Sequence, residues 1–211
     1  MRIRFGLLVG IALLMGSQAF AQEYSKWEVP VDYTFARGNP ANVGKPFSLN
    51  GGGGGLVYNF DQYFGIKMDL QGYGSTTRTA TDFLIVNPLS NTTVSSATFQ
   101  ANLFTYMFGP LIRVPMHTFK PFAELLFGGA HSNTYSNLYK ASGACCVAPN
   151  NNAFAMAVGG GFDIRVNKTI SIRPFQMDYL LTRFGTSFIP GGYHNQNNFR
   201  YLAGVNFTFG E

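Results

Sequence analysis

Adjacent His131 and Ser132 are the residues of this 211-residue sequence whose types best match a nucleophilic centre. A serine nucleophile needs a base within hydrogen-bond reach and a third group that orients the base. Neighbouring residues of a β-strand, however, point to opposite faces. Because the segment that ends at His131 has strand character, we expect the imidazole and the hydroxyl to be kept apart, and we expect no Ser–His–acid site.

The glycine runs and the cysteines offer no better site. Gly51–Gly55 lacks the Lys and Ser/Thr of a phosphate loop, and Gly159–Gly161 lacks the dinucleotide-binding spacing. We interpret the adjacent Cys145 and Cys146 as an exposed pair in a loop. A vicinal or an intermolecular disulfide between cysteines is the alternative. Two cysteines and three dispersed histidines do not make a structural zinc site. We therefore expect no catalytic residue, no cofactor and no metal.

Charged residues follow a different pattern, because many of them stand opposite a row of apolar residues. Lys67 and Asp69, for example, alternate with Ile66 and Met68. Unpaired buried charge is costly, so an enclosed polar face should contain ion pairs that link strands. The set that we expect to form such a network has nearly balanced charge and comprises Lys67, Asp69, Asp163, Arg165, Arg173, Asp178 and Arg200.

Alternation with a period of two is the main pattern of the chain and predicts β-strands. Ile172 and Phe175 are three residues apart, so we expect a one-residue bulge near Pro174. The facing of the fourth and fifth strands stays open, because both carry apolar residues on their two faces. The pattern predicts eight strands, roughly 27–36, 53–60, 63–74, 98–114, 120–131, 152–166, 169–184 and 198–209.

The connections between these strands alternate strictly in length. Three connections are short, namely residues 61–62, 115–119 and 167–168. The other connections are long and rich in Gly, Asn, Ser, Thr and Pro. Outer-membrane barrels have this layout, with short periplasmic turns, long extracellular loops and both chain ends on the periplasmic side. The sequence therefore predicts four long extracellular loops, at 37–52, 75–97, 132–151 and 185–197.

The N-terminus has the features of a signal peptide. Arg2 and Arg4 precede an apolar run, and Ala19 and Ala21 occupy the small-residue positions of a cleavage site. We predict that residues 1–21 are removed and that residues 22–211 form one domain. No later segment is long and apolar enough for a spanning helix, which needs roughly 20 residues.

Composition points away from a water-soluble domain and from nucleic acid. Charged residues make up 12% of the chain and aromatic residues 16%, whereas soluble domains average about 25% charged residues. The formal charge of +5 is scattered and forms no basic cluster, so we expect no nucleic-acid partner. Because lipid offers the backbone no hydrogen-bond partner, a sheet spans a membrane only by closing on itself. We predict an all-β fold, an eight-stranded antiparallel up-and-down transmembrane β-barrel, whose narrow lumen is filled by side chains.

Aromatic residues near the strand ends suit two interfacial girdles, which transmembrane barrels place at both membrane surfaces. We expect one girdle to contain Trp27, Phe60, Phe64, Phe162, Phe207 and Phe209, and the other to contain Phe35, Tyr73, Tyr179, Phe184, Phe199 and Tyr201.

Four segments of the chain resemble the small outer-membrane barrels of the OmpA/OmpX-like and porin-family type. They are YMFGP (106–110), KPFAELLFGGAH (120–131), residues 159–184 and NNFRYLAGVNFTF (197–209). The resemblance implies outer-membrane lipid and the barrel-assembly machinery as partners. It also implies a C-terminal insertion signal formed by Gly204, Phe207 and Phe209, although Leu202 fills a slot that is usually polar. No peptidoglycan-binding domain follows the eighth strand, so we do not expect cell-wall tethering.

These patterns leave four functional hypotheses. The favoured one is a non-enzymatic outer-membrane barrel that contributes to envelope structure or surface interaction through its long loops. A narrow pore for small solutes and a lipid A-modifying membrane enzyme are alternatives. Lipid A deacylases use an H-x-S spacing, from which adjacent His131 and Ser132 depart. A soluble calycin-like barrel, apolar inside and polar outside, is the fourth. The ligand and the surface partner are not identified by the sequence.

Overall fold

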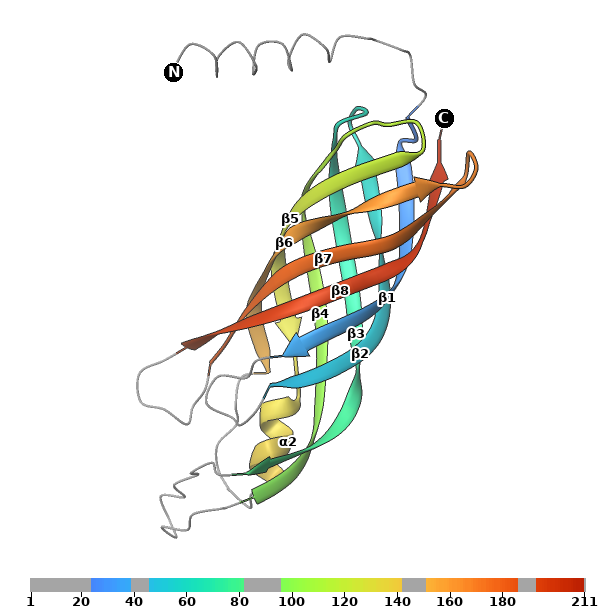
Figure 1. The fold of residues 1–211 in the computed structure, drawn as a ribbon. Coiled ribbons are helices and arrows are strands. Elements are labelled where there is room, and N and C mark those ends of the chain that lie inside the picture. The colour runs from blue at the N-terminus through green and yellow to red at the C-terminus, as the bar shows by residue number, and fades with distance from the viewer. Residues whose placement is uncertain (1–23, 39–45, 82–95, 142–150, 186–192, 211) are drawn as a thin grey trace, which may run out of the picture.

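Eight antiparallel strands form a closed barrel in the computed structural model, which describes residues 24–38, 46–81, 96–141, 151–185 and 193–210. Each strand pairs with its neighbours in the sequence, and β1 pairs with β8 to close the sheet (Figure 1). The strands are β1 Trp27–Gly38, β2 Phe47–Asn59, β3 Phe64–Thr81, β4 Ser96–Arg113, β5 Phe119–His131, β6 Asn152–Arg165, β7 Ile170–Gly185 and β8 Tyr193–Phe209. The predicted fold class is confirmed.

Several elements extend beyond their predicted bounds into segments that we expected to be loops. β2 begins at Phe47 because the glycine-rich segment pairs with β1 from Gly38 onward. β3 and β4 continue as a ladder as far as the Thr81–Ser96 pair. The third long connection contains a helix, α2 (Thr134–Ala141), that periodicity did not indicate. Glycine, threonine and serine predict loops by composition, but backbone pairing to a neighbouring strand stabilises these residues as strand.

Alternating burial along each strand defines an inner and an outer wall. On β3, Lys67 and Asp69 are fully buried, whereas Ile66 and Met68 are more than two-fifths exposed. The fourth and fifth strands, whose facing was open, follow the same rule. Phe104, Phe108 and Ile112 of β4 face outward while Thr105, Met107 and Arg113 face inward. On β5, Glu124 and Leu126 point inward, between outward Leu125 and Phe127.

The bulge expected near Pro174 is confirmed. The pairing of β7 with β8 shifts between Arg173 and Gln176, and its pairing with β6 shifts between Phe162 and Ile164. Proline has no N–H to donate to a ladder, so a bulge is one of the few places where a paired strand tolerates it. The shift keeps Arg173 and Asp178 on the same inner wall although they are an odd number of residues apart.

Glycine is required where inner-wall side chains pass close to a neighbouring strand. A Cβ at Gly53 would lie 2.1 Å from the Leu70 carbonyl oxygen and 2.5 Å from Oε1 of Gln71. A Cβ at Gly204 would lie 2.7 Å from Oδ1 of Asp32. All three distances are shorter than any van der Waals contact, so these positions make room for the polar side chains of a narrow barrel.

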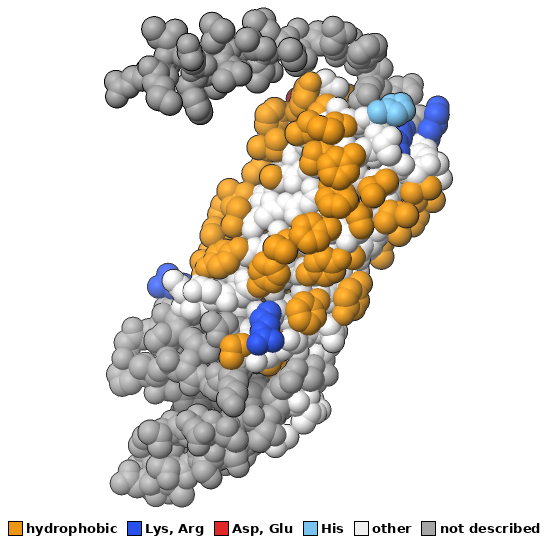
Figure 2. All heavy atoms as spheres, in the orientation of Figure 1, with side chains coloured by type: hydrophobic (Ala, Val, Ile, Leu, Met, Phe, Trp, Pro, Cys, Tyr) orange, Lys and Arg blue, Asp and Glu red, His pale blue; other side chains and the backbone are white. Residues whose placement is uncertain are grey.

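The outer wall is apolar around its middle, as the space-filling view shows (Figure 2). The start of β1 and the end of β8 lie at one end of the barrel, called the terminal end from here on. The other end, which carries α2, is the loop end. Within the described residues no helix is long and apolar enough to cross a membrane.

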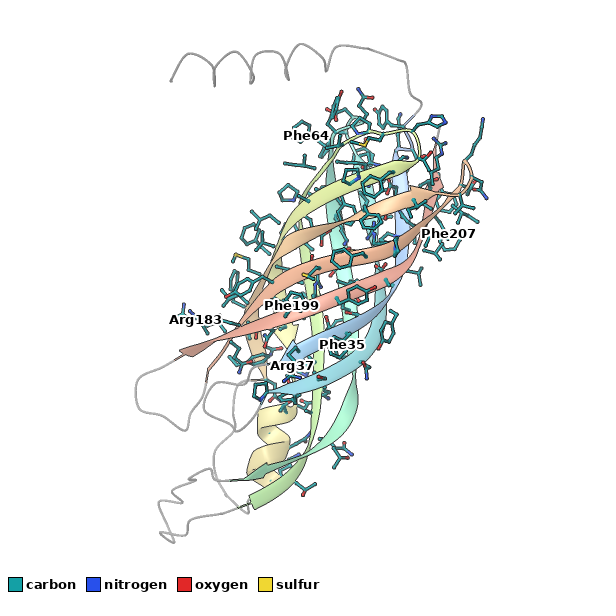
Figure 3. The ribbon with its side chains drawn as sticks, in the orientation of Figure 1. Phe35, Arg37, Phe64, Arg183, Phe199 and Phe207 are labelled. Atoms are coloured by element: carbon teal, nitrogen blue, oxygen red, sulfur yellow. The ribbon has the colours of Figure 1, made fainter. Side chains whose placement is uncertain are left out.

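Two of the expected girdle residues do not face outward. Tyr73 and Phe184 are 4% and 2% exposed and belong to the inner wall of β3 and β7. Thr34 donates a hydrogen bond to the Tyr73 hydroxyl, and Phe184 packs in an apolar cluster. Among the other expected girdle residues, Phe64 and Phe207 lie near the terminal end, and Phe35 and Phe199 lie toward the loop end (Figure 3). The girdle prediction was therefore wrong for Tyr73 and Phe184, because alternation along their strands places both on the inner wall.

Candidate functional site: the filled interior of the barrel

Arg200 lies at the centre of the interior and joins four strands. From β8 its Nε donates to Oδ2 of Asp178 on β7 at 2.6 Å, and its Nη1 donates to Oδ2 of Asp69 on β3 at 2.7 Å. Its Nη2 is 3.6 Å from Oε1 of Glu124 on β5. All four side chains are at most 4% exposed, so this guanidinium cross-links the barrel wall from within.

Lys67 is a second cation beside two of these carboxylates, those of Asp69 and Glu124. Its Nζ is 2.9 Å from Oε2 of Glu124 and 3.4 Å from Oδ1 of Asp69. The amide of Gln176 donates to Glu124 at 2.9 Å and to Asp178 at 3.0 Å. Buried ions need both opposite charge and hydrogen bonds to offset the loss of hydration. Side chains of several strands supply both here, although Oδ1 of Asp178 and Nη2 of Arg200 have no hydrogen-bond partner among the described residues.

Arg173 and Asp163 form a second buried pair nearer the terminal end. Arg173 donates to the two carboxylate oxygens of Asp163 at 2.8 and 3.1 Å, a bidentate geometry. The guanidinium also lies 4.4 Å from the centre of the Phe122 ring. Asn206 then bridges to the next layer, because its amide donates to both Asp163 and Glu28.

Glu28 and Arg113 close the terminal end of the interior. Both guanidinium nitrogens Nη1 and Nη2 of Arg113 donate to the Glu28 carboxylate, the second at 2.9 Å. Asn59 donates to the same carboxylate at 2.8 Å. Next to this pair is a cavity of about 170 Å³ whose lining includes Lys120 and Arg165.

The structure brings together six of the seven charged residues that the sequence singled out. Arg165 is the exception, because it is only partly buried, lines the mouth at the terminal end and donates from Nε to the Asn167 carbonyl at 3.3 Å. Sequence reasoning did not include Glu28, Asp32, Arg113 and Glu124, all at most 7% exposed. Alternation along the first predicted strand indicates Glu28, because it is four residues from Asp32 and therefore on the same face.

The charges of the described interior do not balance. Six carboxylates, those of Glu28, Asp32, Asp69, Glu124, Asp163 and Asp178, are buried with the cations Lys67, Arg113, Arg173 and Arg200. Asp32 differs from the other five, because neither of its oxygens has a hydrogen-bond partner within the described part of the chain. This carboxylate lies between Gly53 and Gly204, its two neighbours across β2 and β8.

An apolar layer fills the interior on the loop side of the ion network. It is formed by Met107, Leu126, Ala130, Ala155, Ala157, Leu180 and Phe184. Beyond it, toward the loop end, lies a space of only about 40 Å³ that includes Leu49 and Leu103 in its lining. The interior therefore consists of a polar half and an apolar half, and neither contains a wide aqueous channel along the described residues.

His131 and Ser132 have structural roles. Ser132 is 4% exposed, and its hydroxyl donates to the Asn102 carbonyl at 2.6 Å and lies 2.7 Å from the Thr134 hydroxyl at the start of α2. His131 faces the other way, with its Nδ1 2.9 Å from Oδ1 of Asn152. No metal-binding group of three His, Cys, Asp or Glu side chains occurs among the described residues. Cys145 and Cys146 lie outside them.

The three residues of the expected insertion signal lie on different walls. Gly204 faces inward between Asp32 and Arg173. Phe209 is 51% exposed on the outer wall, and Phe207 faces outward as well. This arrangement presents the two aromatic rings to lipid, and their role in insertion stays a prediction.

Comparison with known proteins agrees with this architecture. The model of the outer membrane protein beta-barrel domain family matches residues 7–210. Neisserial surface protein A is 14% identical, with a TM-score of 0.53 over 89% of this chain and 100% of that one. Outer membrane protein W of E. coli is 10% identical, with a TM-score of 0.46 over 89% and 100% of the two chains. No curated protein matches the sequence. Because the family model spans nearly the whole chain, this protein belongs to the outer membrane protein beta-barrel domain family, whose members lie in the outer membrane of Gram-negative bacteria.

Proposed function

We propose that this protein is a non-enzymatic barrel with a sealed lumen that contributes to envelope structure or surface interaction. In this proposal residues 1–21 are a cleaved signal peptide, the barrel-assembly machinery inserts residues 22–211, and the terminal end faces the periplasm. The four long connections then face the cell exterior. The alternation of short turns and long connections supports this orientation, because outer-membrane barrels keep both chain ends and the short turns on the periplasmic side.

The observation that carries the proposal is the inversion of the usual protein interior. Val31, Phe108 and Ile172 are about half exposed on the outer wall, while Lys67 and Arg200 are fully buried. In water such an outer wall would be a large apolar patch, and such patches mark contact with lipid or with other proteins. A soluble calycin-like barrel requires the opposite arrangement, so the facing of the side chains argues against that hypothesis.

A narrow pore is the weaker alternative. Ions on such a path would have to pass the Glu28–Arg113 pair, the carboxylates around Arg200 and the apolar layer at Leu126 and Leu180. Each of these layers is packed with side chains of opposite walls. We expect purified protein in a planar bilayer to show no discrete conductance steps, and reproducible single-channel steps would favour the pore instead.

Two measurements test the main proposal directly. Unheated protein from the membrane fraction should migrate differently from boiled protein in gel electrophoresis, as expected of a closed barrel. Protease added to intact cells should cut within residues 82–95 or 142–150 while leaving the strands protected. Cleavage that requires a permeabilised outer membrane would reverse the proposed orientation. An altered acyl pattern of lipid A in cells that express the protein would contradict the non-enzymatic assignment.

A further inference from the structure

The Asp32 carboxylate of β1 lies on the inner wall with a glycine on each side. β8, β1 and β2 are neighbours in the closed sheet (Figure 1), and Asp32 pairs with Gly204 of β8 and with Gly53 of β2. We propose that Asp32 binds a monovalent metal cation of the size of sodium inside the barrel, together with the side-chain oxygens of Gln71 and Asn206. This inference goes beyond the proposed function and does not depend on the orientation of the barrel in the membrane.

The excess of negative charge in the interior makes a counter-ion favourable. Six buried carboxylates and four buried cations leave two negative charges without a buried cation among the described residues. The cations nearest to Asp32 are Arg173 and Lys67, but Arg173 holds both oxygens of Asp163, and Lys67 lies between Glu124 and Asp69. Burying an unpaired charge is costly. A cation taken up from solution beside Asp32 would reduce that cost.

Two amide oxygens near Asp32 also lack a partner. The NH2 group of Gln71 donates to Oδ1 of Asp69 at 3.3 Å, and that of Asn206 donates to Oε2 of Glu28 at 2.6 Å. Each amide therefore has its oxygen as the remaining end, and neither oxygen has a hydrogen-bond partner among the described residues. Carbonyl and carboxylate oxygens are acceptors only and cannot satisfy one another. A cation satisfies all of them at once.

The strand register brings these oxygens near Asp32. Gln71 pairs with Gly53, and its Oε1 is 2.5 Å from the position that a Cβ would take at Gly53. This oxygen therefore lies over β2, about one strand spacing of 4.8 Å from β1. Asn206 is two residues beyond Gly204 on β8 and is thus a diagonal neighbour of Asp32, within reach of a long side chain.

These separations suit a cation that is shared between oxygens. Oxygen ligands of calcium lie about 2.3–2.6 Å from the ion, and sodium has nearly the same ionic radius. Two oxygens that share such an ion are therefore up to about 5 Å apart, which is close to one strand spacing. The absence of a side chain at Gly53 and Gly204 leaves the inner wall beside Asp32 to these oxygens.

The donor set favours a singly charged ion over a divalent one. One carboxylate and two amide oxygens supply a single negative charge, whereas calcium sites typically combine several carboxylates and magnesium keeps several of its waters. Within the described ranges no group of three His, Cys, Asp or Glu side chains could hold a metal ion. None of the oxygens of Asp32, Gln71 and Asn206 named above is accessible to water. A dehydrated ion smaller than water, such as sodium, therefore fits this position best.

Urea unfolding of the purified protein in zwitterionic lipid vesicles tests the inference. Sodium replaces N-methylglucamine at constant ionic strength, and the fluorescence of Trp27 reports unfolding. A ligand that binds only the folded state stabilises it with the logarithm of its concentration. The equilibrium constant of unfolding of the wild type should therefore fall about tenfold for each tenfold rise in sodium above the dissociation constant. Asp32→Asn should show no such dependence, and Gln71→Met should need a several-fold higher sodium concentration for the same effect.

Asp61→Asn is the matched control, because it removes an exposed carboxylate from the turn between β2 and β3. This control should keep the sodium dependence of the wild type. Wild-type stability that does not change with sodium would overturn the inference, and so would an unchanged dependence in Asp32→Asn. In the first case, a pH dependence of stability that Asp32→Asn abolishes would identify a proton as the counter-charge instead. Heat-modifiable migration of each variant shows that the barrel is closed, which separates failure of this inference from failure of the proposed function.

Discussion

Replacing Arg200 by methionine tests whether the buried ion network stabilises the barrel. Methionine keeps much of the side-chain volume but removes the charge that Asp69 and Asp178 share. The two carboxylates are affected unequally. Asp69 keeps Lys67 at 3.4 Å, whereas Asp178 has Arg200 as its one ion-pair partner among the described residues. The substitution therefore leaves one buried carboxylate without a neighbouring cation.

The expected loss of stability follows from that unpaired carboxylate. Breaking a buried ion pair by removing one partner costs about 3–5 kcal/mol, because the remaining charge stays desolvated. Adding Asp178→Asn removes that charge and should recover at least about half of the loss. The same methionine substitution at exposed Lys168 should change the free energy of unfolding by less than about 0.5 kcal/mol.

Urea unfolding in lipid vesicles measures these differences. Trp27 is the sole tryptophan of the chain and lies on the outer wall, so its fluorescence reports transfer from lipid to water. With a slope of about 2–3 kcal/mol per molar urea, Arg200→Met should lower the midpoint by roughly 1–2 M. The reasoning is refuted if Arg200→Met unfolds with the wild-type midpoint, or if adding Asp178→Asn lowers the midpoint further.

Three other substitutions test separate features. Gly53→Ala should destabilise the barrel by about 1–3 kcal/mol in the same assay, because a Cβ there would lie 2.1 Å from a backbone oxygen. Gly52→Ala, whose Cβ would meet only a carbonyl oxygen at 3.4 Å, is its control and should have a much smaller effect. Phe209→Ala should lower the amount of heat-modifiable protein in cells several-fold without slowing spontaneous folding into vesicles, whereas Phe199→Ala should leave assembly unchanged. Ser132→Ala should make the segment around α2 more sensitive to protease, because the serine hydroxyl bonds at the start of the helix. If Ser132→Ala instead changes the acyl pattern of lipid A, the structural role assigned to this serine is wrong.

Local sequence patterns were sufficient for features with a period of two. Alternation around Ile66 and Met68 placed Lys67 and Asp69 on the inner wall, and the break in phase before Phe175 predicted the bulge. Alternation did not decide the facing of β4 and β5, because both faces of these strands carry apolar residues. The pattern also missed the first part of β2, residues 47–52, which form strand because they pair with β1.

The sequence by itself determined the number of strands, their antiparallel order and the wall to which most charged residues belong. These properties depend on neighbours along the chain, since the pleat of a strand fixes which face each residue takes. Tertiary structure alone decided which charges meet. Arg200 and Asp69 are 131 residues apart and come together because the sheet closes between β8 and β1. That closure, with its stagger between strands, also leaves Asp32 without a hydrogen-bond partner among the described residues. No local pattern encodes the stagger.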